Sequence, residues 1–199
     1  MPRRVRCDSC ICRLACGGHR ERHESERSMR KQPGKTVADS LTETVEIVLP
    51  NDANPLGNIL GGKVMHLIDI VGAISAHRHC RTLLVTASVD NVDFVHPIKI
   101  GQLIVLRAFV TRTFNTSIEV EVNVFSEDGM TGQRRQTSSA FVTYVAVDRD
   151  GRPTRVPPIV PVTAEEKRRY REALARRRRR LAAAASAHRR YFEKSEGPS

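Results

Sequence analysis

The 199-residue sequence lacks a long hydrophobic run, because charged residues interrupt every apolar stretch. A membrane-spanning helix needs about 18 or more consecutive apolar residues, so we expect no membrane span. The arginine-rich beginning is not followed by an apolar run with a small-residue cleavage site, and we therefore expect no secretory signal. Both absences favour a cytoplasmic protein.

Cysteine is almost absent beyond the first 36 residues. The early cluster consists of Cys7, Cys10, Cys12 and Cys16, with His19 and His23 close behind. Such a cluster can bind zinc, but structural zinc sites usually combine two ligand pairs that lie far apart in sequence, and no second pair follows. A metal site there stays the less favoured alternative to an unstructured extension, and we expect no metal or other cofactor.

The net charge of +11 is carried by the two ends of the chain. Residues 1–36 hold 10 Lys/Arg against 4 Asp/Glu, and residues 161–199 hold 12 against 5, so the middle is slightly acidic. The first segment shows no apolar periodicity and is predicted to be a disordered basic tail. The last is predicted to be a basic helical tail, with five arginines at 176–180 beside an alanine run. These arginines could attract nucleic acid or another acidic surface, but a solvated extension is favoured, and we do not expect nucleic acid as a partner.

Between the tails, the pattern predicts one strand, one helix and then four strands. The strands are expected at 41–49, 83–94, 103–113, 117–125 and 138–147, and the helix at 60–79. The 117–125 run alternates cleanly, with Ile118 on one face and Glu119 and Glu121 on the other. Short separations between the later strands favour an antiparallel meander.

The expected helix is apolar on nearly every side. One side carries Val64, Leu67, Ile68, Val71 and Ile74, and the other carries the small or flexible Gly61, Met65, Gly72, Ala73 and Ala76. A helix of this kind is usually buried. The economical packing is a curved antiparallel sheet of about five strands wrapped around it. This predicts an α+β fold of the hot-dog type over residues 37–160, with a helical C-terminal extension.

Asp69 is the exception on this apolar helix. An unpaired buried carboxylate costs several kcal/mol, so Asp69 is expected either to pair locally or to face a pocket as a general base or nucleophile. Gly61 and Gly62 begin the helix, where free N–H groups at the positive end of the dipole suit a developing oxyanion. Asn54 precedes them; its amide could hold a water or a carbonyl, although an asparagine before proline is also ordinary turn chemistry.

The stretch N-x-x-G-N-x-x-G-G-x-x-M-x-x-x-D at residues 54–69 resembles the signature of hot-dog acyl-CoA thioesterases. The similarity is to the branch with the brain-type acyl-CoA hydrolase and the bacterial broad-range acyl-CoA thioesterases. Further matches follow in order: A-x-R-H-C (76–80), V-T-A-S-V-D-x-V-D-F (85–94), P-I-x-x-G (97–101) and S-A-F-x-T-Y-V-A-V-D (139–148). The resemblance covers about 38–160.

The resemblance implies hydrolysis of acyl-CoA to fatty acid and coenzyme A. Asn54 from one unit and Asp69 from its neighbour would form the catalytic site, so a homodimer, expected to assemble further into a hexamer, would contain two sites. Asp69 would act as general base or nucleophile, and the N–H groups of Gly61 and Gly62 would polarise the thioester carbonyl. Met65 would border the acyl tunnel.

Contacts to coenzyme A itself are assigned by elimination. Arg78, Arg81 and Lys99 are the available cations for its phosphates, and Ser138 and Ser139 are candidates for its pantetheine arm. A hot-dog protein that binds acyl-CoA without turnover remains an alternative.

The expected helix also contains histidines. Hot-dog dehydratases pair a histidine with an acidic residue on the central helix, and His66 and Asp69 could mimic such a pair. The G-G-x-x-M-x-x-x-D motif at residues 61–69 fits a hydrolase better than a dehydratase. His79, near the end of the helix, is expected as a cation that complements the dipole.

Overall fold

The computed structural model describes residues 33–90 and 92–195, with side chains in the last helix described as far as residue 186. Most of the expected N-terminal tail, including its cluster of cysteines, lies outside these residues. Among the described residues, no helix has both the length and the apolar character needed to cross a membrane.

The order of elements confirms the predicted succession of strand, helix and four strands. The elements are β1 (Lys35–Thr36), the 3-10 helix η1 (Ala38–Ser40), β2 (Thr42–Ile47), the 3-10 helix η2 (Pro50–Asp52), α2 (Gly61–Cys80), β3 (Leu83–Val89), β4 (Leu103–Thr113), β5 (Ser117–Glu127), β6 (Arg134–Val147), β7 (Ile159–Val160) and α3 (Ala164–Ser195). The second of the five long strands, β3, ends earlier than predicted, and the last of them, β6, begins earlier.

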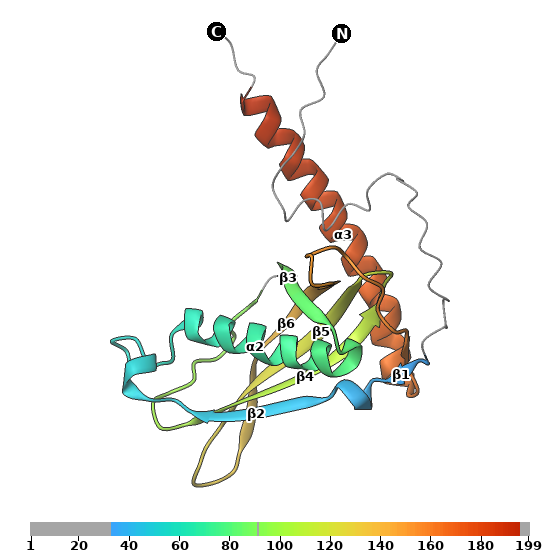
Figure 1. Cartoon of the computed structure of the whole chain (residues 1–199). Helices are drawn as coiled ribbons and strands as arrows, with labels where there is room; N and C mark the ends of the chain where they lie inside the picture. Colours follow the sequence, from blue (N-terminus) through green and yellow to red (C-terminus); the bar gives the residue numbers. More distant parts are fainter. Residues whose placement is uncertain (1–32, 91, 196–199) are drawn as a thin grey trace, which may run out of the picture.

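Five strands form one antiparallel sheet in the order β2-β4-β5-β6-β3. The sheet curls around α2, which is the predicted hot-dog architecture (Figure 1). The expected meander is confirmed for β4, β5 and β6. It is wrong for β3, which crosses to the far edge and pairs with β6 instead of β4. β1 and β7 form a separate parallel pair.

The core lies between α2 and the concave face of the sheet. Val64, Leu67, Ile68 and Val71 are buried there, against the alternating residues Ile118, Val120, Val122 and Val124 of β5. The prediction of a helix buried on all sides is wrong for the single chain, because one sheet covers only one side of it. Met65, Ile70 and Ile74 remain 48%, 42% and 38% exposed.

The small-residue side of α2 has a specific neighbour. A β-carbon at Gly72 would overlap the hydroxyl group of Tyr144, which lies on β6. Gly72 thus lets the phenol ring pass directly against the helix backbone, and this close approach explains the glycine at that position.

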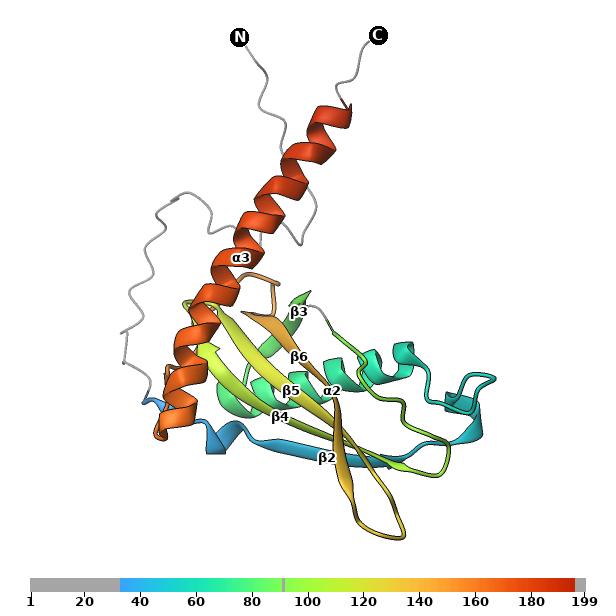
Figure 2. The same cartoon turned by 180° about the vertical axis from the view of Figure 1, so that it is seen from behind.

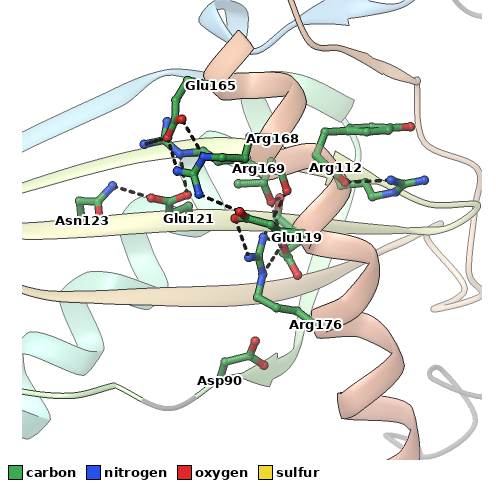
Figure 3. A network of polar contacts seen from close by, with 12 residues as sticks. Asp90, Arg112, Glu119, Glu121, Asn123, Glu165, Arg168, Arg169 and Arg176 are labelled. Atoms are coloured by element: carbon green, nitrogen blue, oxygen red, sulfur yellow. Dashed lines mark hydrogen bonds and ion pairs between the residues drawn. The ribbon is translucent and has the colours of Figure 1, made fainter. Parts of the chain in front are cut away.

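The first half of α3 packs across the outer face of the sheet, and the helix then continues past the sheet (Figure 2). The basic tail is therefore not a solvated extension along this half. Glu119, on the face of β5 that the alternation marked as polar, is fully buried beneath α3. Arg176 donates to its Oε1 through Nε and Nη2, at 3.1 and 2.8 Å (Figure 3). Thr111 donates to the same oxygen at 2.8 Å.

The C-terminal end of α2 is stabilised in a way the sequence did not indicate. His79 is fully buried and its Nε2 lies 2.9 Å from the carbonyl oxygen of Pro157. Burial lowers the pKa of His79, so the expectation that it serves as a cation is wrong. Lys35 supplies the positive charge instead, since its Nζ donates to the His79 carbonyl oxygen at 2.6 Å.

Candidate active site

Asp69 lies on α2, half-buried beneath the neighbouring strands. The Thr86 hydroxyl on β3 donates to its carboxylate oxygen Oδ1 at 2.8 Å. The Tyr144 hydroxyl donates to the backbone carbonyl oxygen of Asp69 at 2.8 Å and lies 3.4 Å from Oδ1. The Thr86 hydroxyl thus orients the carboxylate and the Tyr144 hydroxyl holds the backbone beside it, while the nearby His66 is exposed.

Thr86 and Tyr144 are directly opposite each other on β3 and β6. Burial, and then the charge of Asp69, raise the pKa of the Tyr144 phenol, so it remains a hydrogen-bond donor. Neither residue was singled out from the sequence. Both lie inside matched motifs, at 85–94 and 139–148, but those motifs do not show which side chains meet the aspartate.

The beginning of α2 forms a second part of the site. Leu60, the residue before the helix, offers no side-chain cap, and the first turn contains no acidic residue. Gly61 and Gly62 are exposed. A helix start leaves its first N–H groups without intrahelical partners, so these groups can donate to an anionic oxygen.

Asn54 faces the same region. Its side-chain Oδ1 accepts from the backbone N–H groups of Leu56 and Asn58, at 3.0 and 3.2 Å. Asn54 therefore makes the hydrogen bonds typical of a turn. Because these bonds use its side-chain oxygen, its NH₂ group remains available to donate. Asn54 and Gly61 line a cavity of about 360 Å³ together with Val64, Phe94, His96 and other residues.

Within one chain, these two parts remain apart. Asp69 is not among the described residues that line the cavity, and it follows Gly61 by eight positions, about 12 Å along the helix axis. Apolar side chains are exposed on both elements near Asp69: Met65, Ile70 and Ile74 on α2, and Leu83, Val85 and Val89 on β3. Exposed apolar residues that gather on a surface mark interaction sites, and β3 is an edge strand that can accept a partner.

The expected coenzyme A cations are divided between the two ends of α2. Arg78 donates to the Leu41 carbonyl oxygen at 2.6 Å and to the Thr42 hydroxyl at 3.1 Å, so it holds the beginning of β2. Arg81 is exposed beside it, in the left-handed conformation that ends the helix. Lys99 lies at the opposite end, bridged to Asn58. The three do not converge in one chain.

The two serines point to opposite faces of β6. Ser138 is buried and pairs with Val124, a core residue. Ser139 pairs with Asn123 and lines a hollow of about 560 Å³ on the outer face, near Arg169 of α3. Only one of the two can therefore face the same ligand from this chain. In the described part of the chain, no group of three or more metal-ligating side chains is positioned to hold a metal ion.

Sequence comparisons identify the family. Residues 56–133 match the family model of the Thioesterase superfamily. An uncharacterized acyl-CoA thioester hydrolase of Bacillus subtilis is 45% identical over 119 residues, which are 60% of this chain and 69% of that protein. The chain belongs to the thioesterase superfamily.

Solved structures of this superfamily share the fold. An acyl-CoA hydrolase from Staphylococcus aureus, in complex with butyryl coenzyme A, coenzyme A and coenzyme A disulfide, has a TM-score of 0.77 and 32% identity, covering 82% of this chain and all of that one. A hexameric acyl-CoA thioesterase in its apo form has a TM-score of 0.74 and 44% identity, covering 77% and 98%.

Other superfamily members differ in length or carry substitutions. The chain spans only 37% of the human cytosolic acyl coenzyme A thioester hydrolase, to which it is 40% identical over 139 residues. The Staphylococcus aureus enzyme has also been solved as three variants, in which an asparagine, an aspartate or a threonine is replaced by alanine.

Proposed function

We propose that this thioesterase hydrolyses acyl-CoA to free fatty acid and coenzyme A, with Asp69 as the catalytic carboxylate. The observation that carries the proposal is the Asp69 carboxylate, held by the Thr86 hydroxyl at 2.8 Å on a helix whose Met65, Ile70 and Ile74 are exposed. The names of the relatives and the coenzyme A ligands of the Staphylococcus aureus structure support the substrate class.

The Staphylococcus aureus variants support the choice of residues. In that protein the substituted asparagine precedes the aspartate by the same number of positions as Asn54 precedes Asp69. Its substituted threonine follows the aspartate by the same number of positions as Thr86 follows Asp69. We therefore add Thr86 to the catalytic pair proposed from the sequence.

Each group has a distinct task in the proposed mechanism. Thr86 donates to Oδ1 of Asp69, beside the Tyr144 hydroxyl, which leaves Oδ2 to take a proton from water or to attack the thioester carbon. The N–H groups of Gly61 and Gly62 would stabilise the charge that develops on the thioester oxygen. The Asn54 NH₂ group would orient the carbonyl or the water, and Met65 would border the acyl chain.

The site is proposed to be shared between two protomers. Since Asn54, in the loop before α2, and Asp69, within α2, remain apart in one chain, the exposed apolar residues of α2 and β3 would meet a second copy and bring the two together. A two-fold axis then produces two equal sites. We propose further assembly into a hexamer, the state described for one solved relative.

Contacts to coenzyme A are proposed for the cations at the rim of this shared site. Arg81 and Lys99 are better placed than Arg78, which is already engaged with the start of β2. Ser138 and Ser139 remain candidates for the pantetheine arm, but because they lie on opposite faces of β6, only one of them would contact it from a given chain. We propose a cytoplasmic location, which the cytosolic relatives support.

Nucleic-acid binding through the arginine run is not favoured. Arg176 and Arg180, two of its five arginines, are engaged with Glu119 and Asp90 and are not available to bind phosphates. Arg177 stacks on Phe114, with its guanidinium 4.2 Å from the ring centre.

The proposal is tested by following thiol release from acyl-CoA substrates of increasing chain length. The intact chain should release coenzyme A, and Asp69→Asn should lower kcat by a factor of about 100 or more, because the carboxylate that activates the nucleophile is lost. Asp150→Asn is the matched control, since Asp150 is an exposed surface carboxylate. Binding of acyl-CoA without release by the intact chain would instead identify a non-catalytic binding protein.

A further inference from the structure

The end of β3 is attached to α3 on the outer face of the sheet. Asp90 directly follows β3, and its backbone N–H donates to the Phe141 carbonyl oxygen on β6 at 2.9 Å. Its carboxylate Oδ2 accepts from Nη1 of Arg180 at 2.9 Å. The side chains of Asp90 and Arg180 are only 21% and 15% exposed, so water screens their ion pair weakly.

Arg180 joins this strand end to the interior of the sheet. Its second terminal nitrogen, Nη2, lies 2.9 Å from Oε2 of Glu119 on β5. Glu119 is fully buried, and its other oxygen is bound by Arg176 and Thr111 (Figure 3). Because the guanidinium group is a rigid planar fork, it fixes the position of Asp90 relative to this anchored carboxylate.

The position of Asp90 matters because β3 also carries Thr86. Within one chain β3 is an edge strand with β6 as its neighbour, and its register shifts between Thr86 and Ser88. Such an irregularity re-aims the side chains next to it. Thr86 lies opposite Tyr144 and reaches Asp69, whereas Ser88 lies opposite Thr143. Holding both ends of the irregular stretch keeps the Thr86 hydroxyl directed at the carboxylate.

We propose that Arg180 is a positioning residue for the hydrolysis site: its ion pair with Asp90 keeps β3 in the register that directs Thr86 toward Asp69. This inference rests on the proposed function and extends it to the C-terminal helix. The helix is thereby part of the catalytic domain, although it does not touch the reacting atoms.

Full-length Arg180→Ala should lower kcat about tenfold, because small misplacements of catalytic groups have effects of this size or larger. KM should change less than about twofold, since none of the proposed substrate contacts is altered. Arg179→Ala is the matched control: it removes the same charge from the adjacent exposed position of α3 and should leave kcat unchanged. Arg180→Lys keeps the charge and should restore part of the loss.

A double-mutant cycle with Thr86→Val separates positioning from general stability. In the Thr86→Val background, Arg180→Ala should lower kcat by less than about twofold further, because the hydrogen bond that it protects is already absent. An equal loss in both backgrounds, or an unchanged kcat in Arg180→Ala alone, would overturn the inference. If the intact chain releases no thiol at all, it is the proposed function that fails.

Folding of each variant is checked by its thermal transition and its size in solution. Should Arg180→Ala not fold, Asp90→Asn provides the same comparison, because it keeps the shape of the side chain and weakens only the ion pair. We expect Asp90→Asn to lower kcat by less than Arg180→Ala does, and to cause no further loss in the Thr86→Val background. An additive loss would overturn the inference there as well.

Discussion

Replacing Arg176 by alanine should destabilise the protein by about 3 kcal/mol. Removing one partner of a buried ion pair typically costs about 3–5 kcal/mol, because the remaining charge is left uncompensated. Glu119 is fully buried, but Thr111 and Arg180 would still contact it, which favours the lower end of that range. Arg176 also stacks on Phe141, with its guanidinium 3.7 Å from the ring centre, and loss of this contact adds to the cost.

Urea unfolding at a fixed protomer concentration measures this change. With a denaturant slope of about 1–3 kcal/mol per molar, the midpoint for Arg176→Ala should fall by about 1 M or more. Arg176→Lys should lie between the two, because it keeps the charge but loses the forked hydrogen bonds and the stacking. Arg178→Ala, at an exposed position of the same arginine run, should stay within about 0.5 kcal/mol of the wild type. An Arg176→Ala protein as stable as the wild type would refute the view that α3 neutralises a buried carboxylate.

Three other predictions concern packing, pH and assembly. Gly72→Ala should destabilise the protein by about 1–3 kcal/mol and lower kcat, because the new methyl group displaces Tyr144 from Asp69; unfolding and activity measurements check this. His79, close to Lys35 and Asp39, has its pKa lowered by burial, so its contribution to stability is present above pH 6.5 and is lost as the pH falls below that value. Between pH 7 and 5 the unfolding free energy of the wild type should therefore fall more steeply than that of His79→Gln, by at most about 1.4 kcal/mol per pH unit; equal slopes would contradict this. Val85→Arg, on the exposed edge strand, should give a single folded protomer in light scattering and abolish thiol release, whereas an active assembly of unchanged size would argue against that interface.

The sequence predicts the hot-dog fold well because its signals are local. The two-residue alternation of β5 and the apolar helix at 61–80 each follow from neighbouring residues, and their predicted bounds lie close to the observed ones. The beginning of β6 was missed because Arg134, Arg135 and Gln136 have no apolar alternation. The crossing of β3 to the far edge was missed because strand spacing does not reveal which strand becomes a neighbour.

The role of α3 could not be predicted from periodicity. Glu119 and Glu121 alternate with apolar residues and therefore looked like a solvated face, while the arginine run looked like a solvated helix. Their partners, Arg176 and Arg169, lie about 50 positions further along the chain. At such a separation, a single sequence does not show whether two opposite charges form an ion pair or whether each is hydrated at the surface.

The candidate site was predicted in part. Asp69 stood out because a carboxylate is rare on a helix of this kind, and in the structure its Oδ1 accepts from the Thr86 hydroxyl. Thr86 and Tyr144 did not stand out, since threonine and tyrosine are ordinary strand residues. Their contribution depends on the register between β3 and β6, which only the folded chain fixes.

The shared site is tested most directly by mixing two inactive variants, Asn54→Ala and Asp69→Asn, refolded together in equal amounts. In a mixed dimer one of the two sites receives both intact residues, so random pairing should restore about a quarter of the wild-type kcat per chain. The separate variants should stay nearly inactive. If the mixture is no more active than its components, although mixed dimers are shown to form, Asn54 and Asp69 do not act across a subunit interface.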